Sequence, residues 1–513
     1  MRFKNFSEIL AHNEACWASH PVVTMDTETW TYGDLAIASR RVGALLYGAG
    51  IRKGDQVGVL LSNQPMFLAC MFGAAHIGAV PVLINAFYGS KEILQIAAHS
   101  EIKLLMVEPV VRGAKLLELV ENARLTGALP CLKTIWSVPD LSKELKREDF
   151  SASWYPDVEV GPSDIGVSIY TSGTTGHSKG VLQTYGGLIE NARVTAELMA
   201  YSERDVLLPA LPLFSSAGVS LTLISLLSGT HMVLIDRNNP EIILDTIEKH
   251  RVTILDMVPI GLKLLMKFNE KHGRDLSSLR LVVVGGDSSP PEVGKQVLNT
   301  LGCNFAVVYG LTETGPVVSI TRLDDAEEQK VATVGPPIEG VKIAIRDNAG
   351  NDLPQGEVGE VCCQGPYVLP GYFRNPEATA QARDAEGWFA TGDLGMLRSD
   401  GRLVIVGRKK DMVLIGGHNV FPSEVEAHLI THAGVKEVAV IGIENGGMGN
   451  HLAAFVIPKD VNLTAEKVLD FCSSLASFKV PRHVVLTSEF PYTGSGKVNK
   501  RVLMENWVKD AQA

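Results

Sequence analysis

The sequence predicts an α/β protein whose larger part consists of doubly wound, mostly parallel sheets, followed by a small α+β domain. Short apolar runs alternate with amphipathic stretches as far as residue 400. The texture changes to short strands and turns near residue 341, and a near-neutral segment closes the chain. The 513 residues, 46% hydrophobic and 20% charged, can fill several cores and exclude a disordered chain.

Buried strands are expected where apolar runs stand between turn signals. These runs are VGVLL, VPVLI, KLLMVE, HMVLID, VTILDMV and LRLVVVGG, and such continuous runs are typical of sheets covered on both faces. Amphipathic periodicity between the runs predicts helices, for example at 35–48 and 241–250. The alternation of strand and helix predicts parallel βαβ units.

Two stretches, residues 56–90 and 206–235, contain no Asp, Glu, Lys or Arg. Their length would allow a membrane span, which needs about 20 apolar residues. Polar and helix-breaking residues such as Asn63, Pro81 and Pro212 interrupt both stretches. We therefore expect protein core and no membrane span, with strand 57–61, helix 65–77 and strand 80–84 in the first stretch.

Charge and cysteine usage narrow the class of protein. The formal net charge is −10, and this sign repels nucleic acid and anionic membrane surfaces, so neither is an expected partner. The seven cysteines show no CxxC pair and no regular spacing, which favours reduced thiols. Charged residues interrupt the apolar residues near the N-terminus, so no secretory signal is visible. A cytoplasmic location is expected.

The chain is expected to divide after residue 407. Residues 408–513 hold 12 basic and 11 acidic residues, so the preceding residues carry a net charge of −11. The segment opens with the charged turn Arg408-Lys409-Lys410-Asp411. We predict a body at 1–407, with a small antiparallel β-barrel or sheet from about residue 341, and a small terminal domain at 408–513.

The densest chemical signal is a glycine-rich loop, YTSGTTGHSKG at residues 170–180. It follows the strand-like residues 165–169 and combines three glycines, five hydroxyl side chains and Lys179. Backbone N–H groups, hydroxyls and a lysine can together surround phosphate oxygens, so we predict a phosphate site rather than a plain surface loop. The loop is not a Walker motif, because GxxxxGK[ST] would require glycine at Ser178 and a hydroxyl residue at Gly180.

With this loop, the chain resembles the adenylate-forming superfamily of acyl-CoA synthetases, peptide-synthetase adenylation domains and luciferases. The similarity recurs in family order along almost the whole chain. The segments that carry it are TWTYGDL, GIRKGDQVGVLLSN, YTSGTTGHSKG, LPLFSSAG, VVVGGD, YGLTETGP, TGDLG, GRKKDMVLIGGHNVFPSEVE and PYTGSGKVNKR. The resemblance implies a body of two doubly wound α/β subdomains and a small β-barrel subdomain, followed by a mobile α+β domain.

The resemblance also implies a two-step reaction. A carboxylate attacks the α-phosphate of ATP to give an acyl-adenylate and pyrophosphate, and a thiol then displaces AMP to form a thioester. Two anions meet in the first step, which needs cations and Mg²⁺ at the phosphates. By resemblance, Tyr309 stacks on adenine, Thr312 bonds the α-phosphate, and Glu313 ligates Mg²⁺ together with Thr174. The expected nucleotide-binding residues in these two loops are Thr171, Ser172, Gly173, Thr174, Thr175, Gly176, Lys179, Tyr309 and Gly310.

Further nucleotide contacts are implied elsewhere in the chain. Gly285-Gly286-Asp287 matches the end of the family's adenine-binding strand, although the third residue there is usually small or Glu. By resemblance, Asp393 accepts hydrogen bonds from both ribose hydroxyls, and Arg408 contacts ribose or phosphate. Read alone, Asp393 could cap a turn and Arg408 could lie in solvent.

The terminal domain is expected to supply a catalytic lysine. By resemblance, Lys497 contacts the substrate carboxylate and the α-phosphate and stabilises the adenylation transition state. Lys410 occupies the hinge about which the small domain rotates after adenylation. The loop at Gly416 and Gly417 then forms the thiol tunnel, so that one body hosts two half-reactions.

The segments expected to bind the acid contain one departure from the family pattern. Ser215 stands where many acyl- and aryl-CoA synthetases have a histidine that orients the carboxylate, so we expect a weaker orienting role, or none, at this position. The absence of an acidic residue between Asp205 and Asp236 weakens an amino acid substrate. The expected pocket is small and apolar, which favours an uncharged aliphatic (fatty) or aromatic acid over a dicarboxylate. Its candidate residues are Phe214, Ser215, Gly218, Gly310 and Gly315.

The acceptor thiol is expected to come from outside the chain, because no carrier domain follows Lys497. Coenzyme A is the commoner acceptor. A stand-alone acyl carrier protein is the alternative and would make the protein an acyl-AMP ligase. A third alternative, a relative that binds nucleotide and forms no thioester, is disfavoured by the intact Lys497, Glu313 and Asp393. The expected partners are a carboxylic acid, ATP and CoA, and the family suggests a homodimer.

Overall fold

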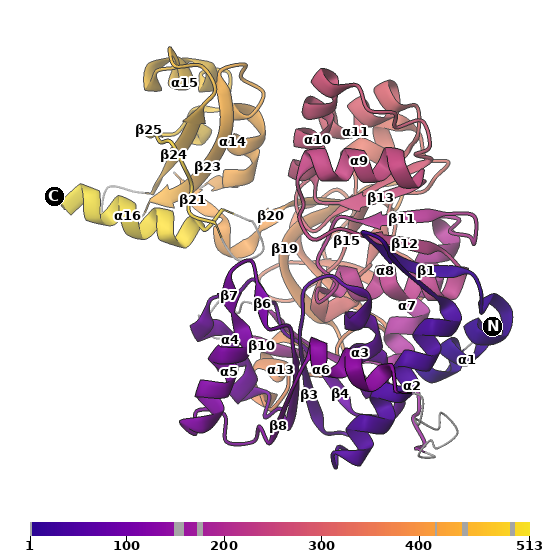
Figure 1. The fold of residues 1–513 in the computed structure, drawn as a ribbon. Coiled ribbons are helices and arrows are strands. Elements are labelled where there is room, and N and C mark those ends of the chain that lie inside the picture. The colour runs from indigo at the N-terminus through magenta and orange to yellow at the C-terminus, as the bar shows by residue number, and fades with distance from the viewer. Residues whose placement is uncertain are drawn as a thin grey trace. The chain divides into compact units, whose positions relative to one another are not determined.

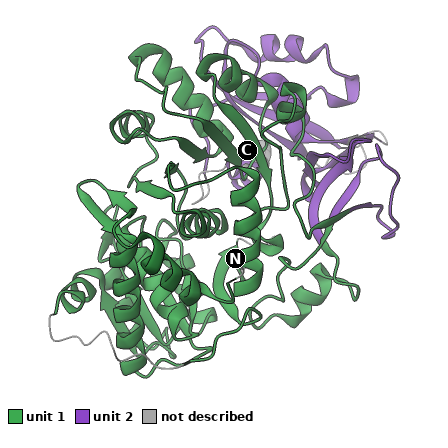
Figure 2. Cartoon of the chain, turned by 90° about the vertical axis from the view of Figure 1, so that its right-hand side faces the viewer, with its two compact units in different colours: residues 1–343, 363–389 green, residues 344–362, 390–513 purple. Residues whose placement is uncertain are grey.

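The computed structural model describes residues 3–147, 158–171, 178–415, 418–443, 450–492 and 498–512. The chain forms two compact units, residues 1–343 with 363–389 and residues 344–362 with 390–513 (Figure 2). Strands and helices alternate throughout the first unit (Figure 1), as the alternation of apolar runs predicts.

One sheet of the first unit has eight strands in the order β16-β15-β14-β13-β11-β12-β1-β2. The strands from β15 to β1 in this order run parallel to one another. The two edge strands, β16 and β2, run antiparallel to the strands that they pair with. All residues of β13 are buried, which is why such strands read as continuous apolar runs. The bounds are β1 (Pro21–Met25), β2 (Glu28–Thr31), β11 (Val206–Pro209), β12 (His231–Leu234), β13 (Ile254–Met257), β14 (Leu281–Gly285), β15 (Asn304–Tyr309) and β16 (Ser319–Ile320).

The other large sheet has six strands in the order β10-β9-β4-β3-β5-β8. It is parallel except for β10, which pairs antiparallel with β9 at one edge. A small hairpin of β6 (Val110–Val111) and β7 (Ala114–Lys115) stands apart from it. The bounds of the six strands are β3 (Gln56–Leu60), β4 (Val80–Leu83), β5 (Leu104–Val107), β8 (Thr134–Ser137), β9 (Ile165–Thr171) and β10 (Lys179–Thr184). Both sheets confirm the doubly wound α/β prediction.

Helices cover these sheets, and one large apolar cluster joins both sheets to α1, α2, α3, α7 and α8. The helices of the first unit are α1 (Phe6–Trp17), α2 (Tyr32–Gly48), α3 (Pro65–His76), α4 (Ser90–His99), α5 (Leu116–Leu125), α6 (Val138–Leu145), α7 (Tyr185–Leu198), α8 (Ser216–Ser228), α9 (Pro240–His250), α10 (Pro259–His272), α11 (Pro291–Gln296), α12 (Glu327–Ala332) and α13 (Pro376–Ala382). A π-helical turn, η1 (Val297–Leu301), continues α11.

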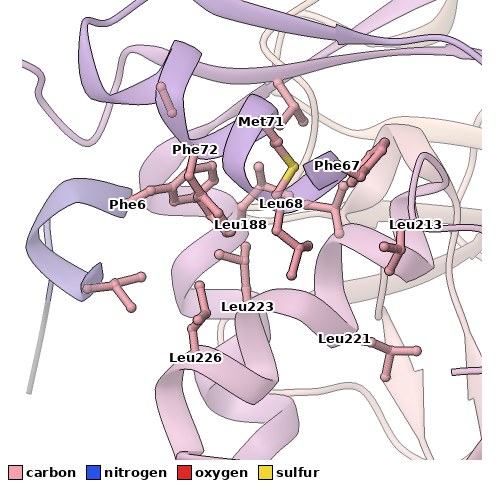
Figure 3. Packing of buried hydrophobic residues seen from close by; sticks show 14 of the residues in the cluster. Phe6, Phe67, Leu68, Met71, Phe72, Leu188, Leu213, Leu221, Leu223 and Leu226 are labelled. Carbon is pink, nitrogen blue, oxygen red and sulfur yellow. The ribbon is translucent and has the colours of Figure 1, made fainter. Parts of the chain in front are cut away.

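The two charge-free stretches form buried core, as predicted. The first gives β3, α3 and β4, and the second gives β11, α8 and β12. All 12 residues of α3 are buried, and a helix that is apolar on every side requires such surroundings. Figure 3 shows Phe72 of α3 beside Phe6 of α1. The two rings are arranged edge to face, with their centroids 5.5 Å apart. Among the described residues, no helix has both the length and the apolarity needed to cross a membrane.

The second unit contains most of a four-stranded sheet and a small α+β part. The segment predicted as a β-barrel or sheet forms the order β17-β18-β19-β20, with bounds β17 (Lys342–Arg346), β18 (Gly359–Gln364), β19 (Phe389–Leu397) and β20 (Leu403–Arg408). A two-stranded sheet and a three-stranded sheet follow, with bounds β21 (Val413–Ile415), β22 (His418–Val420), β23 (Val435–Ile443), β24 (His451–Pro458) and β25 (His483–Leu486).

Three helices accompany the last sheets: α14 (Pro422–Leu429), α15 (Ala465–Cys472) and α16 (Lys500–Gln512). Residues of α14, α15, β23 and β24 share one apolar core, which gives this part the packing of an α+β domain. The predicted domain boundary after residue 407 lies one residue before the end of β20, and the division of the chain at that point stays a prediction.

Candidate active site

Two predicted nucleotide-binding segments follow neighbouring strands of the eight-stranded sheet. β14 ends at Gly285 and β15 at Tyr309, and Gly285 pairs with Val308 in the parallel ladder. A Cβ atom at Gly285 would lie 3.0 Å from the Val308 carbonyl oxygen, so the close approach of the two strands favours glycine. Gly286 has φ +76°, which also favours glycine. Gly285-Gly286-Asp287 therefore lies at the same edge of the sheet as Tyr309, the edge formed by the carboxyl ends of the strands. Ligands of open α/β sheets bind at this edge.

The loop after Tyr309 turns sharply, and steric crowding requires glycine at two of its positions. A Cβ atom at Gly310 would lie 2.2 Å from the carbonyl oxygen of Pro316, so no side chain fits there. Gly315 has φ +83°, and a Cβ atom there would lie 2.8 Å from the Cβ of Tyr367. Between them lies the short 3₁₀ turn η2 (Thr312–Thr314). The loop thus fixes the two residues from which we expect chemistry, Thr312 and Glu313.

The Glu313 carboxylate gathers hydroxyl groups from two other segments. Its Oε1 accepts hydrogen bonds from Thr171 Oγ1, at 3.4 Å, and from the Tyr372 hydroxyl, at 3.2 Å. The Leu369 N–H donates to the Glu313 carbonyl oxygen at 2.7 Å. Glu313 in η2 is therefore contacted by two other parts of the chain, the end of β9 and the segment 369–373.

The predicted phosphate loop joins two antiparallel strands. Thr171 at the end of β9 and Lys179 at the start of β10 are paired in the ladder, and the Lys179 ammonium lies 5.0 Å from the centroid of the Tyr372 ring. The first and last residues of the loop are thus close to Glu313 and to its partner Tyr372. The remaining predicted loop residues lie outside the described residues: Ser172, Gly173, Thr174, Thr175 and Gly176.

Thr312 is anchored on both sides. Its Oγ1 donates a hydrogen bond at 3.3 Å to Ser216 Oγ, in the first residue of α8, and its carbonyl oxygen accepts one from the Gln183 amide. The positive end of the α8 helix dipole therefore lies next to the side chain expected to bond the α-phosphate, and such an end favours anions.

Ser215 acts as the N-cap of α8. Its hydroxyl donates to the Pro212 carbonyl oxygen at 2.7 Å and accepts from the Gly218 N–H at 3.0 Å. A Cβ atom at Gly218 would lie 2.3 Å from the same Pro212 oxygen, so this glycine serves close packing. Phe214 is 6% exposed, and its ring contacts that of Phe87. Of the predicted acid-pocket residues in this segment, Ser215 and Gly218 thus have structural roles in the backbone turn.

Asn63 holds the same segment from the other sheet. Its side-chain amide lies in the loop after β3, donates to the Leu211 carbonyl oxygen at 3.0 Å and accepts from the Leu213 N–H at 2.8 Å. Glu108 braces this loop, because its Oε2 accepts from the backbone N–H of Ser62 at 2.9 Å. The Asn63 side chain therefore joins the loop after β3 to the segment 211–213, a contact that the sequence pattern does not show.

In the second unit, Asp393 and Arg408 are partners. They face each other in the β19–β20 ladder, and Arg408 Nε lies 2.7 Å from Asp393 Oδ1. The Asp393 side chain is 5% exposed and that of Arg408 44%, so the buried carboxylate is compensated by a guanidinium that reaches solvent. Their predicted contacts with ribose and phosphate stay predictions.

The remaining predicted residues of the second unit are incompletely described. Lys410 lies in the 3₁₀ turn η3 (Lys409–Asp411), directly after β20, and its neighbour Lys409 pairs with Glu360 at 2.7 Å. Lys497, Gly416 and Gly417 lie outside the described residues, so their predicted roles stay predictions.

Tyr372, Ser216 and Asn63 were missed by sequence reasoning. Tyr372 lies in GPYVLPGYF, a run of aromatic, glycine and proline residues whose composition signals a constrained turn. Its sequence context shows no partner, because Glu313 and Lys179 are far from it in sequence. Asn63 was noted only as a polar interruption of an apolar stretch, and Ser216 stands beside Ser215. Only the contacts of Asn63 and Ser216 in the structure distinguish them from their neighbours.

The chain matches two family descriptions. The AMP-binding enzyme family matches residues 10–373, and the AMP-binding enzyme C-terminal domain matches residues 424–497. The first match alone covers more than half of the chain.

Named relatives resemble the chain over most of its length. A feruloyl-CoA synthase of Amycolatopsis sp is 34% identical over 478 residues, which cover 92% of this chain and 92% of the relative. A 2,3-dihydroxybenzoate-AMP ligase of Bacillus subtilis (strain 168) is 31% identical over 510 residues, covering 98% and 93%. The solved anthranilate CoA ligase AuaEII in complex with anthranoyl-AMP has a TM-score of 0.90 and 26% identity, and the match covers 99% of this chain and 98% of that one.

Proposed function

The chain belongs to the AMP-binding enzymes, the adenylate-forming family that its motifs resemble, and on that premise we propose that it is an AMP-forming acid–thiol ligase. In the first step an acid carboxylate attacks the α-phosphate of ATP, forming an acyl-adenylate and releasing pyrophosphate. In the second step the thiolate of coenzyme A attacks the acyl carbonyl and AMP leaves, which gives the acyl-CoA thioester.

The observation that carries this proposal is the meeting of Thr171, Lys179 and Glu313 in the first unit, within contact of Tyr372. Lys179 and the loop hydroxyls would bind the β- and γ-phosphates. Thr312 would bond the α-phosphate beside the N-terminus of α8, and Tyr309 would stack on adenine at the carboxyl edge of the sheet. Positioning of this kind lowers the barrier by holding the two reacting anions in contact.

The residues at Glu313 fit a magnesium ion. Mg²⁺ prefers hard oxygen ligands and binds through one or two carboxylates together with substrate phosphates, so a single carboxylate beside hydroxyl groups suffices. No cluster of three His, Cys, Asp or Glu residues occurs among the described residues, which is compatible with an ion held largely by phosphate oxygens. Glu313 and Thr174 would hold the ion. When bound, it would neutralise charge on the phosphates.

We also propose roles for residues of the second unit. Asp393 would accept the ribose hydroxyls while Arg408 compensates its charge, and the pair at 2.7 Å places both groups together. Lys497 would stabilise the adenylation transition state. Lys410 would act as the hinge between the two steps, and Gly416 and Gly417 would line the thiol tunnel.

An aromatic acid is the favoured substrate class. The two relatives and the solved structure described above are named for feruloyl, dihydroxybenzoate and anthranilate groups, all aromatic. Phe214 is buried and its ring contacts that of Phe87, so aromatic side chains accompany the 211–218 segment. A fatty acid stays an alternative, because apolar side chains would also accept an aliphatic chain.

A carrier protein is the alternative acceptor, and one observation favours it. A relative that matches 98% of this chain is named an AMP ligase and not a CoA ligase. With that acceptor, the protein would load an acyl carrier protein in place of coenzyme A, and adenylation would be unchanged.

An acid panel distinguishes these functions. AMP release from ATP is measured with aromatic and aliphatic acids, with and without CoA, and products are identified by mass spectrometry. We expect CoA-dependent turnover with an aromatic acid and a thioester of the corresponding mass. Turnover that requires added acyl carrier protein would reject the CoA assignment, and the absence of acid-dependent ATP–pyrophosphate exchange with every acid would reject adenylation.

Two variants test the second unit. Lys497→Ala should abolish acid-dependent ATP–pyrophosphate exchange while the fold, followed by circular dichroism, stays intact. Near wild-type exchange would show that Lys497 does not act in adenylation.

The Lys410→Pro variant tests the hinge. It should leave ATP–pyrophosphate exchange unchanged and depress thioester formation, and an equal loss in both steps would argue against a hinge at this residue.

A further inference from the structure

Tyr372 contacts both charged side chains at the phosphate end of the candidate site. Its hydroxyl donates to Glu313 Oε1 at 3.2 Å, and the face of its ring lies 5.0 Å from the Lys179 ammonium. Its side chain is nearly buried, with 8% of the residue exposed. One residue thus meets a carboxylate with its polar end and a cation with its aromatic face.

The backbone around Tyr372 is tied to the elements that carry those two groups. Residue 372 bridges Val181 of β10, and the Phe373 N–H donates to the Gly180 carbonyl oxygen at 2.7 Å, next to Lys179. At its other end the segment donates the Leu369 N–H to the Glu313 carbonyl oxygen at 2.7 Å. The segment 369–373 therefore connects β10 to η2 through hydrogen bonds of its backbone.

The ring of Tyr372 has little freedom to move. It packs in a small apolar cluster with Val181, Leu369, Ala378 and Phe389. Side chains held by packing in this way keep one rotamer, and the groups that they contact lose rotamers as well. The hydroxyl and the ring face are consequently presented in fixed directions.

Both contacts of Tyr372 are of the stronger kind. A phenol hydroxyl that donates to a carboxylate forms a charge-assisted hydrogen bond, which is stronger than a neutral one. The ring face attracts an ammonium group through its quadrupole.

We propose that Tyr372 is a positioning residue for nucleotide phosphates: its hydroxyl orients the Glu313 carboxylate, and its ring face holds the Lys179 ammonium. The proposal rests on the proposed function, in which ATP is the ligand of Thr171, Lys179 and Glu313. Without Tyr372 these groups keep their chemistry, but part of the binding energy is spent on ordering them. Nucleotide affinity therefore falls, and the part that depends on Glu313 falls only when Mg²⁺ is present.

The test is the Kd for ATP, measured by calorimetry on the full chain without acid, with Mg²⁺ and with EDTA. Tyr372→Phe removes the hydroxyl and keeps the ring, so we expect the Kd with Mg²⁺ to rise about tenfold, as for loss of a hydrogen bond to a charged group, and to change less than about twofold in EDTA. Tyr372→Leu also removes the ring face, and the Kd should then rise in both conditions.

Tyr367→Phe is the matched control. Tyr367 is also buried in this part of the chain, and its hydroxyl donates to the Glu339 carbonyl oxygen at 2.8 Å. The control removes a buried tyrosine hydroxyl of the same segment that contacts neither Glu313 nor Lys179, and we expect less than about a twofold change in Kd.

A double-mutant cycle separates positioning from a merely structural role. In a Glu313→Gln background, Tyr372→Phe should add less than about twofold to the Kd with Mg²⁺, because the carboxylate through which it acts is gone. The same tenfold effect in both backgrounds, an unchanged Kd in the single variant, or equal losses with and without Mg²⁺ would each overturn the proposal. A variant that lost its fold would lose affinity in every condition and would count among these contradictions.

Failure of this proposal and failure of the proposed function give different results. Binding of ATP needs no turnover, so the cycle can be measured even if no acid supports pyrophosphate exchange, an outcome that would reject the function alone. Normal exchange together with an unchanged Kd for Tyr372→Phe would reject the role of Tyr372 alone.

Discussion

We compare two regions of the candidate site: the proposed phosphate end, which comprises Thr171, Lys179, Glu313 and Tyr372, and the proposed acid end, which comprises Asn63 and residues 211–218. They use their polar groups in different ways. At the phosphate end, side chains meet side chains: Thr171 and Tyr372 both donate to the Glu313 carboxylate. At the acid end, side chains meet the backbone: the Ser215 hydroxyl caps α8, and the Asn63 amide bridges residues 211 and 213. The first arrangement orients functional groups, and the second fixes the course of the chain.

This difference explains how one fold serves many acids. Under the proposed function, the side chains of the phosphate end bind a part of the substrate that is common to all adenylations. The acid end then supplies a fixed backbone course and apolar residues, with few polar groups to constrain the acid. A substitution at the phosphate end should therefore affect catalysis with every acid, and one at the acid end should affect the choice of acid.

The largest effect is expected for Glu313→Gln. The change keeps the shape and removes the negative charge that Thr171 and Tyr372 orient. We expect kcat/KM for ATP–pyrophosphate exchange to fall at least about 100-fold with every acid, or about 2.7 kcal/mol of transition-state stabilisation. Glu339→Gln is the control, since the Glu339 side chain is 72% exposed, and it should change kcat/KM less than about twofold. A loss confined to some acids would contradict the comparison.

Asn63→Ala should have the next largest effect, at the acid end. It removes two hydrogen bonds and leaves the Leu213 N–H, which is buried, without its partner. We expect KM for the acid to rise about tenfold and the free energy of unfolding to fall by about 2 kcal/mol, while KM for ATP changes less than about twofold.

A matched control for Asn63 is Asn269→Ala. Asn269 makes the same pair of hydrogen bonds to one loop residue, donating to the Arg274 carbonyl oxygen at 3.2 Å and accepting from its N–H at 2.8 Å, on an exposed surface. It should leave both KM values unchanged. An equal rise of both KM values in Asn63→Ala would show that Asn63 does not act on the acid end alone.

A smaller effect is expected for Ser216→Ala, where the two ends meet. The change removes the acceptor of the 3.3 Å hydrogen bond from Thr312 Oγ1. We expect kcat/KM for exchange to fall about fivefold with every acid, as for loss of one neutral hydrogen bond. If the loss depended strongly on the acid used, Ser216 would belong to the acid end, and the division between the ends would shift.

The smallest effect on activity is expected for Ser215→Ala. Loss of the N-cap should lower the free energy of unfolding by about 1 kcal/mol, measured by urea denaturation, and leave KM for the acid within about twofold. A rise in KM of tenfold or more, with normal stability, would show that Ser215 orients the carboxylate after all and that the capping role is secondary.

Much of the fold could be predicted because periodicity reports burial. The first charge-free stretch forms β3, α3 and β4 within one residue of the predicted ends, since a strand or helix buried on every side has no polar positions. Site residues were harder to find. Thr171, Lys179 and Glu313 stand in recognisable motifs, whereas Tyr372 acts through contacts with residues distant in sequence.

Ser215 and Ser216 show where sequence reasoning stops. A motif comparison singles out Ser215, because it replaces a histidine, and it says nothing about Ser216. Their hydroxyls make different contacts in the structure. The Ser215 hydroxyl caps α8, and the Ser216 hydroxyl accepts a hydrogen bond from Thr312. Which of two adjacent hydroxyls points toward a site depends on the direction in which the helix starts.

The sequence by itself determined the α/β class, the order of the strands along the chain and the family, because these depend on local patterns of apolar residues and on motifs that are contiguous. The tertiary structure alone decided that β14 and β15 are neighbours, that β10 lies at an edge, and that Tyr372 meets both Lys179 and Glu313. Pairing between strands and contact between side chains depend on packing across long sequence separations, and local pattern carries no record of it.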